Sequence, residues 1–445
     1  MTDIIHAPNH EILALLQGRT ISARELAEIH LARIGEHNDA LGAVTDLLAE
    51  SALATADRID TARARGEALR PLAGLPVLVK DIIDTVPARC SAGMPFLADR
   101  RPARDAAIVT RLRAAGCVIL GVTATDPGAF GVRTEATRHP IWPELTVGGS
   151  SGGSAAALAA GFGYAALGTD TGGSIRIPAA ACEIAGIKPT YGRWPLDGIR
   201  ALTHTLDHVG PMARSVADLA AIWGALDAGP DTALPQTPRI GVDFSSFAEA
   251  DASVHAGVEA ALAAVRSLGW PVVAVKLPPP ADVIKIHGAI LLCEAAELYE
   301  SEGLADHPDM PDLPRANIAA GRAMPATRYV AAMQARKALQ AKVAHAFDEA
   351  DILLLPTLAI APPLRLAPDV TIAGVAHDFV LALVRYTCLF DHTGHPALAM
   401  PATAGSNAPG TGIQLIARHG ADAALIEVAR RLEERLGLAF DRAIR

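Results

Sequence analysis

Residues 168–178 read GTDTGGSIRIP, and a second Gly/Ser-rich stretch, residues 148–154, reads GGSSGGS. Glycines carry no side chain, so consecutive backbone N–H groups can converge on one point and form a cradle for an anion or an oxyanion. A serine directly after two such glycines, as Ser174 is, can attack the carbonyl that the cradle polarises. The two stretches therefore predict a nucleophilic catalytic site made of two loops.

The sequence around these loops alternates between strand and helix patterns. Apolar runs at residues 77–79 and 117–122 predict buried strands, and helical spacing appears over residues 11–70 and 105–115. This alternation is typical of an α/β fold with a largely buried sheet. Further strands are expected at residues 239–243, 351–355, 397–400 and 412–417, with a final amphipathic helix at 422–436.

No internal repeat or long linker divides the chain, so we expect one domain over residues 1–445. Within it we assign residues 1–72 to an N-terminal helical part, 73–220 to the core that carries both loops, and 221–445 to the rest of the sheet. Residues 277–349 are mainly helical with Pro-rich breaks, and we expect them to form the wall of a substrate cavity.

The composition excludes several classes of protein. A net charge of −9 argues against a nucleic-acid partner, because phosphate binding needs a basic face. Residues 145–169 carry no charge but are rich in Gly, Ser and Thr, so we expect no membrane span there. Five scattered cysteines favour a reducing compartment, and residues 1–11 lack the pattern of a signal peptide. We therefore expect a cytoplasmic protein.

The Gly-rich segments also admit other interpretations. The Gly/Ser turns could simply allow tight packing, and neither holds the Gly-Lys-Ser/Thr of a phosphate loop. Residues 161–166 fit a dinucleotide pattern but follow a helical run instead of a strand. Residues 149–153 match a nucleophile elbow centred on Ser151, which would need a histidine base such as His392 or His395. That hypothesis leaves the second loop unexplained.

The joint arrangement of motifs resembles the amidase signature family. The resemblance is carried by residues 74–81 (GLPVLVKD), both loops, residues 186–193 (GIKPTYGR) and residues 206–216 (LDHVGPMARSV), and more weakly by 393–398 and 412–415. It implies one large α/β domain with a central mixed, twisted sheet covered by helices on both faces. Residues 121–128 depart from the family's usual pattern, so substrate specificity is not carried over from well-known members.

The resemblance implies a Ser–cis-Ser–Lys triad: Ser174 as nucleophile, Ser150 after a cis peptide bond as the bridging serine, and Lys80 as base. The neighbouring Ser151 would brace its loop. A lysine can accept a proton only when neutral, and burial after the apolar residues 77–79 would lower its pKa. Ser150 would then relay the Ser174 proton to Lys80.

The remaining site residues follow from the same loops. We expect an oxyanion hole made by the backbone N–H groups of Thr171, Gly172, Gly173 and Ser174. Asp170 and Arg176 are expected to support it by pairing with each other or with backbone groups. Arg193 is expected either to support the site or to line the pocket. We assign Ile177, Thr125 and Gln414 to the substrate pocket, and the apolar Ile177 favours an apolar or aryl acyl group.

Together with these residues, the resemblance implies a hydrolase that cleaves the C–N bond of a small amide through an acyl-enzyme. Two alternatives remain: a carbamate, urea or biuret-like substrate for the same triad, and an A-type subunit of an amidotransferase complex. No cofactor is expected. A metal site is not expected either, because the pairs His204/His208 and His392/His395 lack a third ligand at suitable spacing. Homodimers are common among similar proteins, so a homodimer is a possible assembly.

Overall fold

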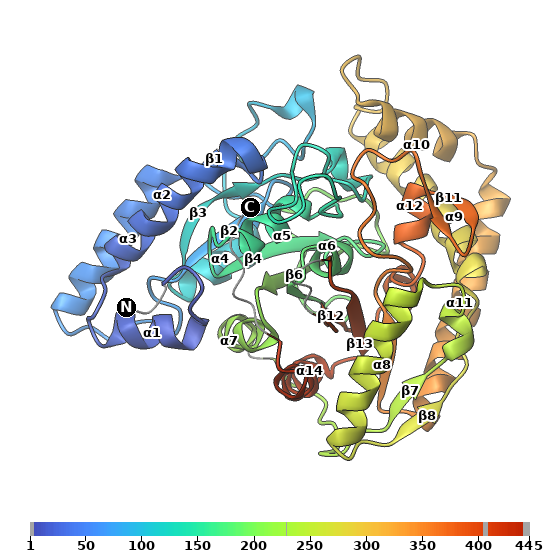
Figure 1. Cartoon of the computed structure of the whole chain (residues 1–445). Coiled ribbons are helices and arrows are strands. Elements are labelled where there is room, and N and C mark those ends of the chain that lie inside the picture. Colours follow the sequence, from blue (N-terminus) through green and yellow to red (C-terminus); the bar gives the residue numbers. More distant parts are fainter. Residues whose placement is uncertain (1–3, 228, 404–407, 439–445) are drawn as a thin grey trace.

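Eleven strands form one mixed sheet in the computed structural model, which describes residues 4–227, 229–403 and 408–438 (Figure 1). Their order is β1-β3-β2-β4-β6-β5-β12-β13-β9-β7-β8. The groups β3-β2-β4 and β9-β7-β8 are parallel, and the other neighbours are antiparallel. The strands are β1 (Val44–Leu47), β2 (Pro76–Lys80), β3 (Val118–Thr123), β4 (Ala165–Asp170), β5 (Ala185–Lys188), β6 (His208–Ala213), β7 (Ile240–Val242), β8 (Val272–Ala274), β9 (Ile352–Pro356), β12 (Ala397–Pro401) and β13 (Gly412–Ile416).

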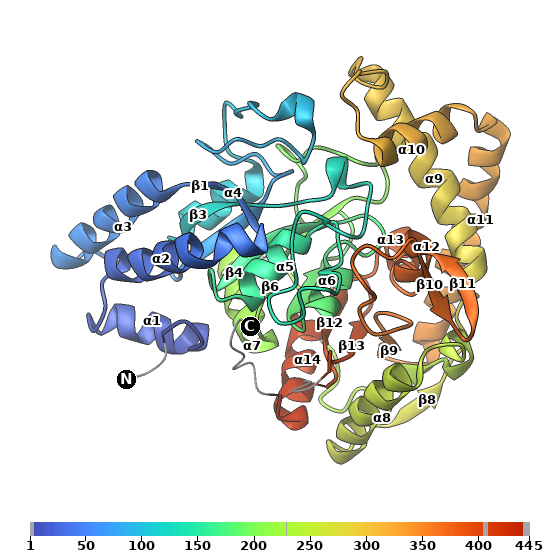
Figure 2. The same cartoon turned by 45° about the horizontal axis from the view of Figure 1, so that its top comes forward.

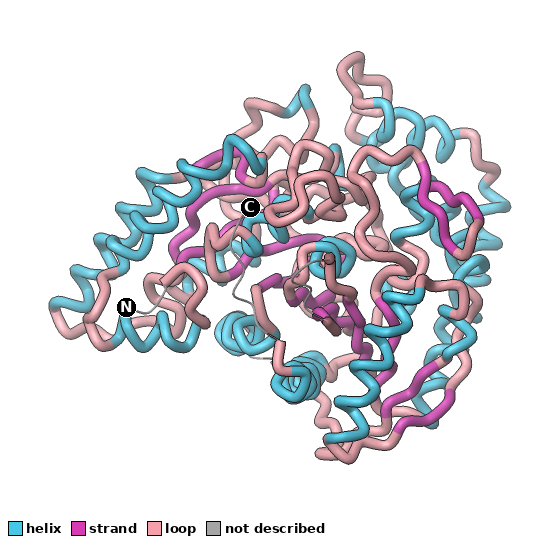
Figure 3. Tube along the Cα trace, viewed as in Figure 1, coloured by secondary structure: helices cyan, strands magenta, loops and turns pink. Residues whose placement is uncertain are grey.

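Helices lie on both sides of this sheet, which confirms the predicted α/β class (Figure 3). In Figure 1, α5 and α6 lie above the central strands, and α7 and α14 lie below them. The helices are α1 (Asn9–Gln17), α2 (Ala23–Leu41), α3 (Ala49–Ala64), α4 (Ala107–Ala114), α5 (Gly152–Ala159), α6 (Arg176–Ala181), α7 (Val216–Leu226), α8 (Ala252–Ser267), α9 (Pro280–Ser301), α10 (Asp312–Arg322), α11 (Ala326–Glu349), α12 (Phe379–Leu383), α13 (Leu389–Thr393) and α14 (Asp422–Leu436).

The apolar, β-branched segments gave correct strand predictions. The six predicted strands correspond to β2, β3, β7, β9, β12 and β13, and the predicted final helix is α14. Burial explains this agreement: β2, β3, β9, β12 and β13 are buried along their whole length, so their sequences are continuously apolar.

The strands next to the two Gly/Ser-rich loops escaped prediction because glycine interrupts them. Gly168 of β4, Gly186 of β5 and Gly210 of β6 all face Ile175, the residue after Ser174. A Cβ on these glycines would come within 3.1, 2.8 and 3.1 Å of the Ile175 side chain. The glycines therefore form a socket on three strands, and Ile175 fills it.

Two helical segments flank the sheet. The N-terminal part holds α1 to α3, but it also contributes β1, an edge strand that was not predicted and that pairs with β3. Residues 277–349 form α9, α10 and α11, which pack together at the opposite side of the molecule (Figure 2). A separate two-stranded sheet, β10 (Asp369–Ile372) and β11 (Val375–Asp378), lies beside α12.

The uncharged stretch 145–169 is part of the core and contains α5 and most of β4. Among the helices in the described ranges, none has the length and apolar character needed to cross a bilayer. The five cysteines are unpaired: Cys90, Cys117, Cys182, Cys293 and Cys388.

Candidate active site

A fully buried lysine ends strand β2. Lys80 Nζ donates hydrogen bonds to Ser150 Oγ at 2.8 Å and to Thr169 Oγ1 at 2.8 Å. Thr169 lies on β4, which pairs with β2 in parallel, so the sheet itself brings this hydroxyl beside the amine. The structure thus joins two members of the predicted triad and adds Thr169, which the sequence analysis did not single out.

The surroundings of Lys80 favour the neutral amine. Burial lowers the pKa of Lys80 from 10.5 to about 7, although the carboxylates of Asp126, Asp170 and Asp207 act in the opposite direction. An amine with this pKa is unprotonated in a substantial share of molecules at neutral pH. That is the state in which it can accept a proton.

Ser150 lies in a tightly packed loop before α5, after a cis peptide bond from Gly149. A Cβ on Gly149 would lie 2.2 Å from Asp126 Oδ2, so no side chain fits there. Thr134 Oγ1 donates to Asp126 Oδ2 at 3.1 Å, and Gly152 N–H donates to Thr134 Oγ1 at 3.2 Å. Asp126 and Thr134 therefore brace the Ser150 loop.

Neither of these two bracing residues was predicted. Asp126 lies in the segment 121–128, whose departure from the family pattern was noted without a role for this carboxylate. Thr134 gave no signal, because a lone threonine in a loop has no distinctive pattern around it.

Ser174 lies between β4 and α6 and is 7% exposed. Its backbone oxygen accepts a hydrogen bond from Ser151 N–H at 3.1 Å, which ties the two serine-bearing loops together. Within the described part of the chain, no protein group is hydrogen-bonded to the Ser174 hydroxyl. The proton link between Ser150 and Ser174 therefore stays a prediction.

Ser151 is bound to the neighbouring strand. Its hydroxyl donates to Thr169 O at 3.2 Å and accepts from Thr169 N–H at 3.2 Å, and the residue is fully buried. The rival nucleophile-elbow hypothesis needs a histidine at Ser151, but the two candidate rings contact other groups. His392 Nε2 lies 3.2 Å from His287 Nδ1, and the His395 ring stacks on Phe347. These contacts favour a bracing role for Ser151.

The nucleophile loop offers fewer oxyanion donors than predicted. The Gly173 N–H donates to Asp170 Oδ1 at 2.6 Å, so it is already occupied, and its assignment to the oxyanion hole is corrected. The N–H groups of Thr171, Gly172 and Ser174 have no protein acceptor within residues 4–227, 229–403 and 408–438. They remain as the proposed donors.

Side chains from distant segments hold this loop. Thr171 Oγ1 donates to Asp207 Oδ1 at 2.7 Å, and Thr387 Oγ1 donates to Gly172 O at 2.5 Å. The loop is thereby fixed on two sides before any substrate binds.

Asp170 and Arg176 form the predicted ion pair, and neither side chain has any exposed surface. Arg176 Nε and Nη2 donate to the two Asp170 oxygens, each at 3.0 Å. Burial alone would raise the pKa of Asp170, but the charge and hydrogen bonds of Arg176 hold it below its usual range. A bidentate pair therefore anchors the start of α6.

Arg176 also binds three groups from the C-terminal third of the chain. Its Nη1 donates to Thr387 O at 2.8 Å and Gln414 Oε1 at 3.0 Å, and its Nη2 donates to Asp391 Oδ2 at 2.8 Å. Burial, together with the negative charge of Asp170, raises the pKa of Asp391 well above its ordinary value. Gln414 is fully buried in this network, which corrects its assignment to the substrate pocket.

Two further pocket assignments can be compared with the structure. Ile177 is fully buried, and its side chain packs against Gly148 and Gly173. The preference for an apolar acyl group that rested on Ile177 therefore loses its support. Thr125 is 8% exposed and its hydroxyl donates to Asp126 O at 3.2 Å, and its place in the pocket stays a prediction.

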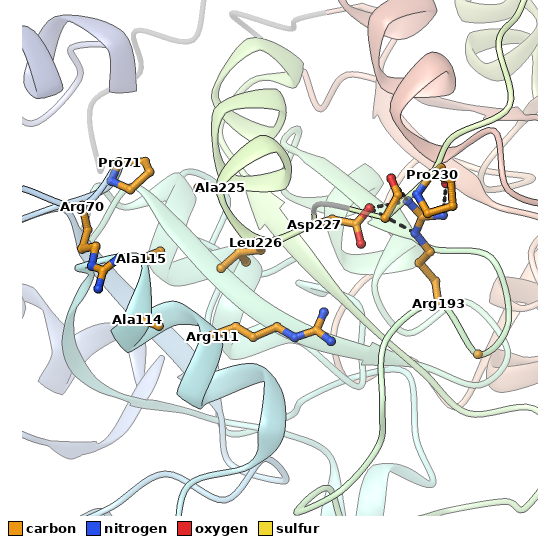
Figure 4. A pocket seen from close by; sticks show the side chains of 12 residues that line it. Arg70, Pro71, Arg111, Ala114, Ala115, Arg193, Ala225, Leu226, Asp227 and Pro230 are labelled. Atoms are coloured by element: carbon orange, nitrogen blue, oxygen red, sulfur yellow. Dashed lines mark hydrogen bonds and ion pairs between the residues drawn. The ribbon is translucent and has the colours of Figure 1, made fainter.

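Arg193 is not part of the candidate active site. It lines a surface pocket of about 730 Å³ that also contains Arg70 and Arg111, as Figure 4 shows. Its guanidinium forms an ion pair with Asp227 and donates to Pro230 O at 2.7 Å. The predicted supporting role is corrected: Arg193 holds the segment after α7.

The histidine pairs form no metal site. His204 Nε2 lies 2.6 Å from the carboxylate of Glu297, and His208 Nε2 lies 3.3 Å from Lys188 Nζ. In the described ranges, no group of three or more His, Cys, Asp or Glu side chains could hold a metal ion.

The Arg176 network makes a prediction for stability. Replacement by Met (Arg176→Met) would leave the Asp170 carboxylate buried without its cation, and we expect a loss of about 3–5 kcal/mol, measured as the free energy of unfolding in urea. The exposed pair of Arg24 with Glu28 provides the control, and Arg24→Met should shift the unfolding midpoint far less. Equal shifts in both variants would contradict the anchoring role.

The family model described as Amidase matches residues 25–426. A putative amidase, AmiD of Mycobacterium tuberculosis, is 34% identical over 96% of this chain and 94% of its own length. The 1-carboxybiuret hydrolase subunit AtzE of a Pseudomonas species is 36% identical over 91% of this chain and 93% of its own.

A solved structure shares the complete architecture. It is described as an unexpected vestigial protein complex that reveals the evolutionary origins of an s-triazine catabolic enzyme. It superposes with a TM-score of 0.90 and 34% identity, covering 99% of this chain and 100% of that one. From the family match, these relatives and the shared fold, we conclude that the chain belongs to the amidase signature family, whose members are hydrolases acting on C–N bonds.

Proposed function

We propose that this protein hydrolyses the C–N bond of a small amide through an acyl-enzyme on Ser174, with Ser150 as proton relay and Lys80 as base. The observation that carries the proposal is the 2.8 Å contact between the fully buried Lys80 Nζ and Ser150 Oγ. A lysine in such a position stays neutral more easily, and only the neutral amine can draw a proton from the serine.

In the first step, Ser174 Oγ bonds to the carbonyl carbon while its proton passes to Ser150 and the Ser150 proton passes to Lys80 Nζ. The carbonyl oxygen becomes an oxyanion, held by the N–H groups of Thr171, Gly172 and Ser174. The C–N bond then breaks, and the leaving amine takes the proton back from Lys80 through Ser150. Water cleaves the acyl-enzyme by the same route in reverse.

A carbamate, urea or biuret-like substrate is the second candidate. It is supported by the similarity to AtzE, whose name is that of a 1-carboxybiuret hydrolase subunit. The same groups would then form a carbamoyl-enzyme. A hydrolysis screen of amides, carbamates and ureas that share one leaving amine separates the two candidates. Within such a set, only the other group on the carbonyl carbon differs.

The third candidate is a subunit that works only with a partner chain. It is supported by two relatives: AtzE, which is a hydrolase subunit, and the solved structure, which is that of a protein complex. Unaided hydrolysis of an amide or urea by the purified chain would contradict this candidate. A separate measurement of the mass of the purified protein in solution would test the predicted homodimer.

Ser174→Ala should abolish turnover and prevent the covalent adduct of an aryl sulfonyl fluoride, because the attacking oxygen is removed. Intact-mass spectrometry of the labelled protein is the measurement. Ser151→Ala is the matched control from the neighbouring loop and should still form the adduct. If the adduct survives in Ser174→Ala but is lost in Ser151→Ala, the nucleophile is Ser151 instead.

The rate should depend on pH through Lys80. Because the pKa of Lys80 is lowered to about 7, kcat/KM should rise about tenfold per pH unit below pH 7 and level off above it, as the amine loses its proton. Lys80→Ala should lower kcat/KM by roughly 10²–10⁴ and remove this acidic limb.

A second buried lysine gives the control for this profile. Lys188 Nζ donates to Pro189 O at 3.0 Å and His395 O at 2.7 Å, and burial lowers the pKa of Lys188 to about 8. In Lys188→Met, the acidic limb of the kcat/KM profile should keep its midpoint near pH 7. If the acidic limb of the pH profile disappears in Lys188→Met and persists in Lys80→Ala, the base is Lys188 and the assignment of Lys80 is wrong.

A further inference from the structure

A histidine from helix α9 lies against the nucleophile loop. A Cβ on Gly172 would come within 2.7 Å of His287 Nε2 and 2.9 Å of its Cε1. The edge of the imidazole therefore faces the main chain two residues before Ser174, and this contact explains why residue 172 has no side chain. His287 is 6% exposed, and within the described ranges its Nε2 has no hydrogen-bond partner.

The other nitrogen of this ring is bound to a second histidine. His287 Nδ1 lies 3.2 Å from His392 Nε2, and the two rings meet edge to face with centroids 5.2 Å apart. The backbone of His392 is itself fixed, since Arg336 Nε and Gln340 Nε2 both donate to its carbonyl oxygen. His287 is thus oriented by a contact outside the reacting groups.

The protonation of the pair follows from what surrounds it. Burial lowers the pKa of His287 to about 4 and that of His392 well below 6.5, so each ring carries one proton at neutral pH. His392 Nδ1 is buried and, in the part of the chain described, has no hydrogen-bond partner. A proton there would be an unsatisfied buried donor, whereas an unpaired lone pair costs less.

The proton of His392 therefore belongs on Nε2, where it is donated to His287 Nδ1. His287 then carries its own proton on Nε2, the atom that faces Gly172. The pair delivers one N–H donor to the edge of the nucleophile loop.

We propose that His287 Nε2–H binds a second acceptor oxygen of the substrate, so that the site selects acyl groups with a second carbonyl beside the scissile one. The proposed donors to the oxyanion are backbone N–H groups of the loop. The His287 N–H donor therefore stays available for another oxygen of the substrate. This inference rests on the proposed function, because it uses Ser174 as the attacking group.

Two anilides that differ in one group test the proposal. Acetoacetanilide carries a second carbonyl oxygen, and butyranilide has a methylene in its place. In His287→Leu we expect the ratio of their kcat/KM values to fall about tenfold, mainly through KM of acetoacetanilide, since one hydrogen bond is lost. His287→Gln, which keeps an N–H donor, should restore most of the ratio. The exposed His345 on α11 gives the control His345→Leu, which should leave the ratio unchanged. An unchanged ratio in His287→Leu overturns the inference.

Two further measurements keep the result decisive. In the wild-type protein, acetoacetamide should slow the sulfonyl fluoride labelling of Ser174 more than butyramide does. In His287→Leu, the two amides should slow it equally. Absence of labelling in the wild type contradicts the proposed function, whereas equal protection by both amides in the wild type contradicts only the role of His287. In ¹⁵N-histidine NMR at pH 7.5, His287 should show the Nε2-protonated form, and the Nδ1-protonated form would contradict the argument.

Discussion

The buried pair of Asp170 and Arg176 is the interaction on which the site depends. Asp170 ends β4, and its carboxylate holds the Gly173 and Ile175 N–H groups at 2.6 and 3.1 Å, while Arg176 connects it to the segments that carry Thr387, Asp391 and Gln414. A buried ion pair costs desolvation and adds little net stability by itself. Its effect is geometric: Asp170 fixes the path of the nucleophile loop, and Arg176 ties this loop to segments more than 200 residues later in the chain.

The base of the proposed triad shows how the sheet contributes chemistry. Parallel pairing of β2 and β4 sets Lys80 beside Thr169, and the same burial that makes the sheet stable also favours the neutral amine. The Ser150 loop then needs only a local brace, which Asp126 and Thr134 supply. Fold stability and the protonation state of the base thus have the same physical origin.

Sequence patterns predicted the parts that are continuous along the chain. Apolar runs identified six strands, and the family resemblance led to Lys80 and Ser150 as contact partners. The sequence could not show which distant acceptors complete a buried arginine, so Asp391 was missed and Gln414 was misplaced. Gly173 was misassigned for a related reason: the pattern reveals a free N–H donor but not the carboxylate that already occupies it. Arg193 was predicted to support the site because it ends the motif at residues 186–193, but it lies in a surface pocket instead.

The socket of three glycines around Ile175 has a practical consequence for protein engineering. Any side chain larger than hydrogen at these positions would push on the residue next to Ser174, so the floor of the site has almost no freedom to vary. Changes of substrate range would therefore be sought on α9, whose His287 contacts the loop from outside the sheet. A mutant library confined to residues 280–349, the predicted cavity wall, would leave this floor untouched.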